Sequence, residues 1–356
     1  MPRSRAMRVR GASSRRRTGI VLACAAVSAA ALLTGCTTTG IGSSGPKTDK
    51  VGLSGARLSD PFQVVLLDNL AEQAGEQKVD MLPATNADED AAKQVTDIVT
   101  LLSQNVGGVI TIPVDSDAIV PAIQQADKRG VPVVTVDVAP NGGKAYMVVR
   151  ADNVLMAREA CEEMGKRLNG KGTVLELQGA LGSANGRDRT EGFNQCMTTT
   201  FPGIKVVSKP TDWDSQKATD AAQSVLSSQQ IDGIYEASDT VMQAGVTKVL
   251  QQQGKYVKAG QPGHVVTISI DGGTEALAQI RDGYQDALVP QPVDLYSRYA
   301  IKYIGDALAG KAQAAGPTDH GSQIVVDAHG NLADMLPASI VTAANASDPA
   351  LWGNKS

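Results

Sequence analysis

Planar polar side chains and scarce aromatic rings follow the ends of short β-branched runs in this sequence. Carboxylate, carboxamide and guanidinium groups can bind two neighbouring hydroxyls at once, while an aromatic ring packs against an apolar C–H face. The chain has 7 Tyr, 3 Phe and 2 Trp, so each ring in such a place stands out. These residues predict reversible binding of a small polyhydroxylated molecule, and they lie in segments 58–63, 112–118, 136–137, 152–153, 178–179, 185–193, 211–214, 237–239, 270–273 and 290–291.

Catalysis is the less favoured interpretation of the same segments, because an enzyme needs a nucleophile with a base or an acid–base pair. The three histidines, His264, His320 and His329, lie outside the segments. The carboxylates of Asp137 and Asp271 could in principle act as an acid–base pair. We expect no enzyme activity, no cofactor and no metal.

An alternation of strand-like and helix-like patterns positions these segments. Strands are predicted at 51–54, 78–82, 109–112 and 131–136, and a second series at 173–177, 204–208, 233–235, 265–270 and 287–289. The strands are almost continuously apolar, which is typical of parallel sheets covered by helices on both faces. Helices of the second series are predicted to begin near Asn153, Arg187, Ser215, Asp239, Thr274 and Val293.

The predicted fold class is therefore α/β, with two doubly wound parallel-sheet lobes joined by hinge strands. Ligands of such sheets bind at the carboxyl ends of the strands, here in the crevice between the lobes. We expect the chain to cross between lobes near residues 151, 291 and 322. The N-terminal lobe would then comprise 51–151 and 292–322, and the C-terminal lobe 152–291 and 323–345, with a final strand near 338–342.

The N-terminus has the pattern of an export signal. Arginines at 3, 5, 8, 10 and 15–17 precede an apolar stretch at 19–33 that is too short to span a bilayer. The quartet at 33–36, Leu-Thr-Gly-Cys, resembles the lipobox of bacterial lipoproteins, in which the cysteine receives the lipid. We predict a signal peptide at 1–35, a lipidated Cys36, a flexible tether at 36–50 and an extracytoplasmic, membrane-anchored location. A twin-arginine export signal at 15–17 remains an alternative.

The charge distribution bears on the class of macromolecule that this protein could bind. Residues 1–35 contain seven arginines and no acidic residue, which leaves 26 basic and 37 acidic residues elsewhere. This acidic balance argues against a nucleic-acid partner.

The four cysteines have different expected roles. Cys24 falls in the signal peptide, and Cys36 is assigned to the lipid. The remaining pair, Cys161 and Cys196, would form a disulfide in an oxidising compartment, or would stay as two separate buried thiols.

The ordered set of strand-end motifs, from 51 to about 342, resembles the type I periplasmic solute-binding proteins of sugar ABC transporters, in the ribose-binding-like branch. This resemblance implies two rings that stack on a sugar and a set of polar ligand contacts around them. Phe62 could instead form a hydrophobic staple at the start of a helix, and Trp213 could be an aromatic residue of the core. The implied rings are Phe62 and Trp213, and the implied polar contacts are Asp60, Gln63, Asp137, Arg187, Ser238, Asp271 and Gln291.

The nearby residues bear on these assignments. We expect Arg189 to point away from the crevice, while Arg57 lies either at its rim or in contact with ligand. Asp152 and Asp239 are expected to cap helices, and Ser238 could either cap a helix or contact ligand.

Three departures from the ribose-binding pattern leave the ligand open. Val138 follows Asp137, whereas the ribose-binding pattern has an arginine after this aspartate. Gln63 replaces a second aromatic residue, and Ser238 stands where an asparagine is expected. A pentose, a hexose, a polyol and a cyclitol all remain candidates, and ribose is not favoured.

The resemblance also implies how such a protein works. Two lobes close on a small carbohydrate, and the closed form presents it to a membrane ABC permease. We expect a monomer that touches the membrane through its lipid alone. A lipoprotein that presents bound sugar to a receptor or kinase is the alternative, whereas a LacI-type regulator would need a helix-turn-helix in place of the signal peptide.

Overall fold

The computed structural model describes residues 48–355. The predicted signal peptide, Cys36 and most of the predicted tether lie outside these residues. In the described part, no helix is both long and apolar enough to cross a membrane.

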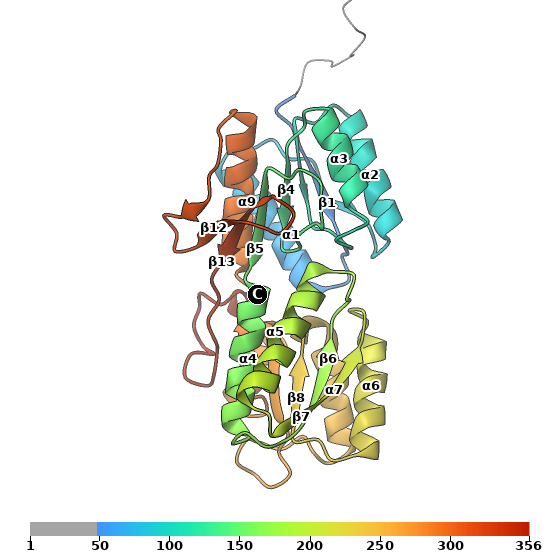
Figure 1. The fold of residues 1–356 in the computed structure, drawn as a ribbon, viewed down its shortest axis with the longest axis vertical. Coiled ribbons are helices and arrows are strands. Elements are labelled where there is room, and N and C mark those ends of the chain that lie inside the picture. Colours follow the sequence, from blue (N-terminus) through green and yellow to red (C-terminus); the bar gives the residue numbers. More distant parts are fainter. Residues whose placement is uncertain (1–47, 356) are drawn as a thin grey trace, which may run out of the picture. The chain divides into compact units, whose positions relative to one another are not determined.

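The N-terminal lobe is built on a sheet that has eight strands within residues 48–355, in the order β11-β12-β13-β5-β4-β3-β1-β2 (Figure 1). Pairing is parallel except at β11–β12 and β12–β13. The strands are β1 (Val51–Gly55), β2 (Thr85–Asn86), β3 (Gly108–Thr111), β4 (Val133–Val136), β5 (Met147–Ala151), β11 (Gly316–Pro317), β12 (Gln323–Val326) and β13 (Leu332–Leu336).

Helices cover both faces of this sheet, because successive side chains of a buried strand point to opposite sides. Val134 and Val136 of β4 pack in one apolar cluster, and Val133 packs in another. The first cluster includes α1 (Pro61–Glu76) and α9 (Val293–Leu308), and the second includes α2 (Ala91–Ser103) and α3 (Val120–Lys128).

The C-terminal lobe has a second sheet, in which the five strands found among the described residues are all parallel, in the order β10-β9-β8-β6-β7. The helices α4 and α5 pack with one apolar cluster, and α6 and α7 with another. The elements are β6 (Gly172–Gln178), β7 (Ile204–Pro210), β8 (Gly233–Glu236), β9 (Val266–Asp271), β10 (Ala287–Pro290), α4 (Asn153–Arg167), α5 (Ala184–Thr200), α6 (Ser215–Ser228), α7 (Asp239–Gln252) and α8 (Thr274–Asp282). The predicted α/β fold with two parallel-sheet lobes is confirmed.

The end of the chain differs from the predicted lobe boundaries. The strand β13 pairs in parallel with β5, and β12 pairs with β13, so residues 323–336 belong to the N-terminal lobe. Their predicted place in the C-terminal lobe was wrong, because the open edge of β5 is completed by β13. Beyond β13, Val341 forms an antiparallel bridge to Leu288 in the C-terminal lobe, where the final strand was expected.

Within residues 51–151, one predicted strand was placed incorrectly and another strand was missed. The predicted strand at 78–82 forms one isolated bridge, between Val51 and Met81, and β2 is the short strand that pairs with β1. The prediction omitted β5 altogether.

The predicted cysteine pair is confirmed as a disulfide. Cys161 of α4 is bonded to Cys196 of α5, with an S–S distance of 2.03 Å and a Cα–Cα distance of 6.2 Å. The bond joins two neighbouring helices on one face of the second sheet, and both residues belong to the apolar core.

Candidate functional site

A cavity of about 420 Å³ lies where the carboxyl ends of strands from both sheets meet. Its size suits a small organic molecule. Eight of the nine predicted binding residues line it: Asp60, Phe62, Gln63, Asp137, Trp213, Ser238, Asp271 and Gln291.

The N-terminal lobe holds Phe62 through the start of α1. Asp60 caps this helix, and its carboxylate accepts a hydrogen bond from the Phe62 main-chain N–H at 3.0 Å. Pro61 occupies the first helical position, where its missing N–H costs nothing. Phe62 is 3% exposed, belongs to the apolar core and also lines the cavity.

Asp137 follows β4 in the same lobe. Its backbone is left-handed, with φ 64°, which turns the side chain out of the strand direction. The carboxylate accepts a hydrogen bond from Asn185 Nδ2 of the C-terminal lobe at 2.8 Å. Burial raises the pKa of Asp137 to about 6, against the opposing effect of the Arg189 charge. The group is therefore a strong acceptor only above this pH.

Arg189 of α5 is the central cation of the cavity and is 2% exposed. Its Nε donates to Asn153 Oδ1 at 2.7 Å, and its Nη1 donates to the Ala237 carbonyl at 2.6 Å and lies 3.4 Å from Asp271 Oδ1. Nη2 is buried without a partner among the described residues.

Asp271 at the end of β9 gathers donors around one carboxylate. Ser238, Thr240 and Gln291 donate to it, in addition to Arg189. Burial raises the pKa of Asp271, although the charge of Arg189 lowers it. The carboxylate is thereby held in one orientation at the cavity wall.

Trp213 supplies the ring of the C-terminal lobe. Asp212 and Trp213 both have left-handed backbones, with φ 56° and 58°. The ring lies on Gly179, where an added Cβ would be 1.9 Å from Trp213 Cη2, so only glycine leaves room for it. The Arg189 guanidinium lies 5.7 Å from the ring centroid, within cation–π range.

Arg187 is the predicted site residue that the structure does not bring into the cavity. Its Nη1 donates to the carbonyls of Leu181 and Gly182, and its Nη2 donates to Asn141 Oδ1 at 2.7 Å. The expected roles of Arg187 and Arg189 were reversed. Residues two apart on a helix point about 200° apart, so one of the two had to face away.

A helical periodicity in the sequence could have identified the correct arginine. Asn185 and Arg189 are four residues apart and share one face of α5. Asn185 contacts Asp137, and Arg189 contacts Asp271, so this face meets both strand ends.

Two expected helix caps have different outcomes. Asp152 caps α4 by accepting from the Leu155 N–H at 3.0 Å, as predicted. Asp239 does not cap its own helix; it accepts from the N–H groups of Gly272 and Gly273 and from Ser269. Burial and the neighbouring Asp271 charge raise the pKa of Asp239 to about 8.

Arg57 lines the cavity and joins the lobes. It forms ion pairs with Asp60 and Glu89 in its own lobe, and its Nη1 donates to the Trp213 carbonyl at 3.0 Å in the other. The Arg57 side chain lines the cavity, and its contact with ligand stays a prediction. Sequence reasoning missed Glu89 as a lining residue, and Asp115, in the predicted segment 112–118, lines the cavity although it was not among the implied contacts.

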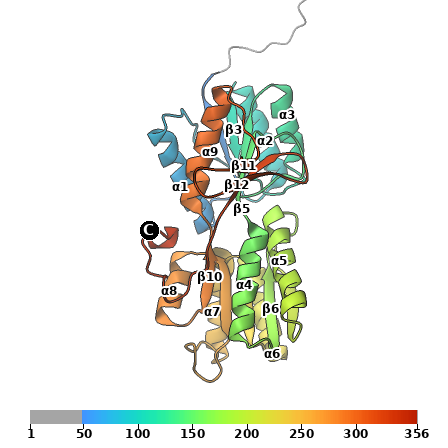
Figure 2. The same cartoon turned by 60° about the vertical axis from the view of Figure 1, so that its left-hand side comes forward.

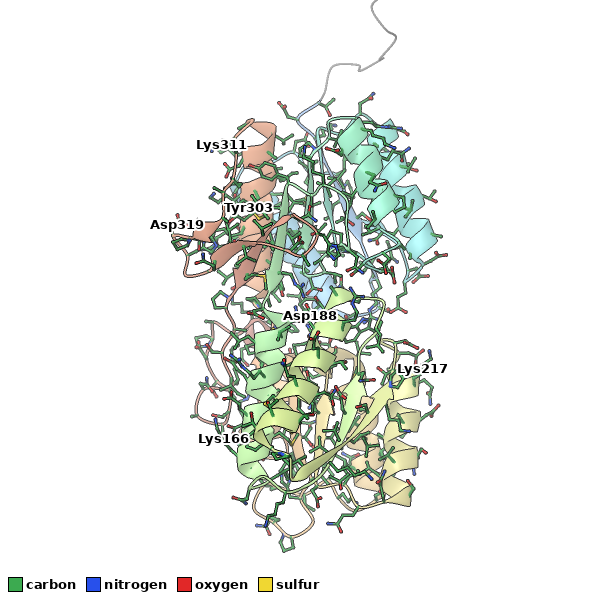
Figure 3. All side chains as sticks on the ribbon, viewed as in Figure 1. Lys166, Asp188, Lys217, Tyr303, Lys311 and Asp319 are labelled. Carbon is green, nitrogen blue, oxygen red and sulfur yellow. A yellow bond between two sulfur atoms is a disulfide. The ribbon has the colours of Figure 1, made fainter. Side chains whose placement is uncertain are left out.

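Further hydrogen bonds cross between the lobes beside the cavity. Ser116 Oγ accepts from the Ala184 N–H at 2.9 Å, and Arg150 is paired with Asp188, which is labelled at the junction of the lobes in Figure 3. The lobes are therefore in direct contact around the cavity.

The chemistry of the lining is that of a binding site. Carboxylates, two guanidinium groups, amides and hydroxyls surround the space, and a ring faces it from each lobe. In the part of the chain that the structure describes, no cluster of three or more His, Cys, Asp or Glu side chains could hold a metal ion.

Comparison with known proteins gives matches over most of the chain. Residues 51–312 match the family described as periplasmic binding protein domain. The ribose import binding protein of Bacillus subtilis is 30% identical over 73% of this chain and 82% of its own length. The xylitol-binding protein of Mycolicibacterium smegmatis is 29% identical over 56% of this chain and 55% of its own length.

A solved structure supports the same assignment. An ABC transporter solute-binding protein from Mycobacterium smegmatis with bound glycerol superposes with a TM-score of 0.72 at 26% identity, covering 84% of this chain and 95% of that chain. The two-lobe fold, the cavity at the strand ends and the extent of the sequence and structure matches all support the same family assignment. This chain belongs to the periplasmic binding protein domain family.

Proposed function

We propose that this protein captures a small neutral carbohydrate, in the range of pentoses, hexoses, polyols and cyclitols, and delivers it to an ABC importer in the membrane. The observation that carries this proposal is the cavity between the lobes, with Phe62 on one wall, Trp213 on the other and Arg189 between buried carboxylates. Two relatives are named for binding ribose and xylitol, and one similar structure contains bound glycerol. All three are consistent with such a ligand.

The polar groups support a neutral ligand. The Arg189 charge already faces Asp271, and Arg57 already pairs with Asp60 and Glu89. A neutral polyol keeps these pairs and can add hydrogen bonds to other polar side chains that line the cavity, such as Asp137 and Gln291. A charged ligand would have to break a pair in a buried site, at a considerable free-energy cost.

Contact with both lobes is the basis of the proposed transport cycle. A ligand between Phe62 and Trp213 stabilises the closed arrangement only if it touches both walls at once. The Arg57 bond to the Trp213 carbonyl would add to this closure from the protein side. The closed surface would then be presented to a permease, with binding and release as the whole activity and no catalytic step.

We also propose that the protein works as a monomer anchored at Cys36. The sequence pattern at 33–36 supports lipidation of this residue, followed by a tether that leaves the lobes free to move near the membrane. A Cys36→Ala variant should accumulate as an uncleaved or shed form. Normal mature protein in the membrane fraction of this variant would contradict the anchor.

A thermal-shift screen tests the ligand class. The purified protein is screened against pentoses, hexoses, polyols and cyclitols, with charged sugar phosphates as a comparison set. A ligand present at a hundred times its Kd should stabilise the protein by about 2.7 kcal/mol. The proposal predicts a hit among the neutral compounds, and it is contradicted if only charged compounds stabilise the protein.

A further inference from the structure

The C-terminal segment 343–355, which we call the C-terminal clasp, returns to the junction of the lobes after the last bridge to β10. Figure 2 shows this end of the chain between α1 of the N-terminal lobe and α8 of the C-terminal lobe. It includes the short 3-10 helix η1 (Trp352–Asn354). The clasp lies beyond residues 51–312, the region that matches the family.

The clasp is fastened to the C-terminal lobe by polar contacts and close packing. Arg281 of α8 donates to the Ala346 carbonyl at 3.0 Å and to Asn354 Oδ1 at 2.8 Å. The Gly353 backbone approaches so closely that an added Cβ would lie 2.3 Å from the Gly272 carbonyl oxygen. This end of the clasp is therefore a defined part of the lobe.

Trp352 extends from this anchor to two cavity residues, one in each lobe. Its indole Nε1 donates to the Asp271 main-chain carbonyl at 2.7 Å. Its ring meets Phe62 edge to face, with centroids 6.2 Å apart and an interplanar angle of 64°. Trp352 is 6% exposed, so these contacts are made in a dry environment.

Both residues that Trp352 contacts belong to the cavity wall, where their positions affect the shape of the binding site. Asp271 has φ 118°, a backbone conformation that side-chain-bearing residues rarely adopt, and the indole hydrogen bond fixes its peptide group. Phe62 is the ring of the N-terminal wall. Near the clasp terminus, Lys355 forms a second link to the N-terminal lobe through an ion pair with Asp294 of α9.

We propose that Trp352 is a positioning residue that holds Phe62 and Asp271 in register across the lobes, so that the C-terminal clasp sets ligand affinity without touching ligand. This inference rests on the proposed function, because it needs a ligand that contacts both residues. Loss of Trp352 would remove one packing partner of the Phe62 ring and one hydrogen bond to the Asp271 carbonyl, so both residues would be less constrained. The ligand would then dissociate faster, while its association rate would change little.

Substitutions of Trp352 in the full-length protein test the inference, and the probe is the neutral pentose, hexose, polyol or cyclitol that stabilises the wild-type protein most in the screen. Trp352→Ala should weaken binding roughly tenfold through a faster dissociation rate. Trp352→Phe keeps a ring against Phe62 and loses the indole N–H, so it should recover part of the affinity. Leu250→Ala is the stability control, because Leu250 packs in the apolar cluster on the other face of the second sheet; it should lower the melting temperature and leave Kd unchanged.

A double-mutant cycle separates positioning from general destabilisation. If Trp352 acts through Phe62, the Phe62→Leu and Trp352→Ala double variant should lose much less affinity than the product of the two single losses. Fully multiplicative losses, or an unchanged Kd in Trp352→Ala, would overturn the inference. A wild-type protein that binds none of the neutral pentoses, hexoses, polyols and cyclitols would instead overturn the proposed function.

A ligand-free measurement guards against misfolded variants. Since the chain has two tryptophans, Trp213→Phe leaves Trp352 as the sole indole fluorophore. Its emission should be that of a buried indole and should resist quenching by acrylamide. An emission typical of a solvated indole would show that the clasp is not docked and would overturn the inference.

Discussion

The two rings of the cavity are held in different ways. Phe62 lies in the first turn of a capped helix, is 3% exposed and meets Trp352 at its edge. Trp213 lies in a loop with two successive left-handed residues, is partly exposed and rests on Gly179 and beneath Arg189. The N-terminal wall is thus fixed by core packing, whereas the C-terminal wall depends on a few specific neighbours.

This difference indicates that the two rings have different roles in ligand binding. A ring fixed by packing is ready to receive a ligand before closure, and it adds little conformational entropy cost. A ring in a loop can adjust, and the Trp213 carbonyl accepts a hydrogen bond from Arg57 of the opposite lobe. We therefore expect variants around Trp213 to act on closure and variants around Phe62 to act on the shape of the wall.

Arg189→Ala should have the largest effect on the adjustable wall. It removes the cation beside Asp271 and the group packed on Trp213, and it leaves a buried carboxylate without its partner. We expect ligand affinity to fall by roughly a hundredfold or more, and the free energy of unfolding to fall by about 3–5 kcal/mol. Titration calorimetry and denaturant unfolding measure the two quantities.

Arg187→Ala is the matched control, because this arginine lies on the same helix and outside the cavity. Its effect on ligand affinity should stay within about threefold. Equal losses from the two arginine variants would contradict the placement of the cation.

Gly179→Ala tests the seat of the Trp213 ring directly. The added methyl group would lie 1.9 Å from Cη2, so the ring must move away from the wall. Affinity should fall by roughly tenfold, similar to the loss from Trp213→Ala, because both remove the same apolar contact. Gly75→Ala, in open space within α1, should leave affinity unchanged. Full affinity in Gly179→Ala would show that Trp213 does not pack on the ligand.

The carboxylates of the two walls also differ, since Asp271 faces a guanidinium and Asp137 accepts from the Asn185 amide. The pKa of Asp137 in the folded protein is raised to about 6 from 3.8. Its contribution to stability is therefore fully present below about pH 4 and is lost as pH rises through 6. Asp137→Asn should stabilise the protein at pH 7.5 by about 1–3 kcal/mol and give no gain near pH 4.

Thermal unfolding across this pH range checks the sign for Asp137. A stabilisation by Asp137→Asn that is independent of pH would contradict the raised pKa. If the ionised carboxylate binds ligand hydroxyls, wild-type affinity should also decline as pH falls below about 6.

Removal of the disulfide should have the smallest effect on the walls. The Cys161–Cys196 bond spans 35 positions and joins α4 to α5. Its loss in a Cys161→Ser, Cys196→Ser variant should lower the free energy of unfolding by about 3–4 kcal/mol. Because both rings are held by local contacts, Kd for the ligand should change little at a temperature where the variant stays folded. A large loss of affinity would show that α5 needs the crosslink to position Arg189.

The sequence was most informative where one strong pattern decides the outcome. Continuous apolar strands predicted the second sheet strand by strand, and the residues after them, such as Asp271 and Gln291, do line the cavity. The alternation of strands and helices also led to the two-lobe architecture. These features follow from local pattern and the geometry of parallel sheets.

Features that depend on distant partners were harder to predict. The choice between Arg187 and Arg189 required the start and phase of α5, and the place of β13 required knowledge that the edge of β5 was open. Trp352 carries no local motif, and its role follows only from its contacts with Phe62 and Asp271, both far away in the sequence.

Titration calorimetry of the wild-type protein against neutral pentoses, hexoses, polyols and cyclitols, at low and at high salt, tests the central claim most directly. The account predicts saturable binding of one neutral ligand per chain, with a Kd nearly independent of ionic strength because no net charge is brought together. Binding of charged ligands alone, with an affinity that falls steeply as salt is added, would contradict it.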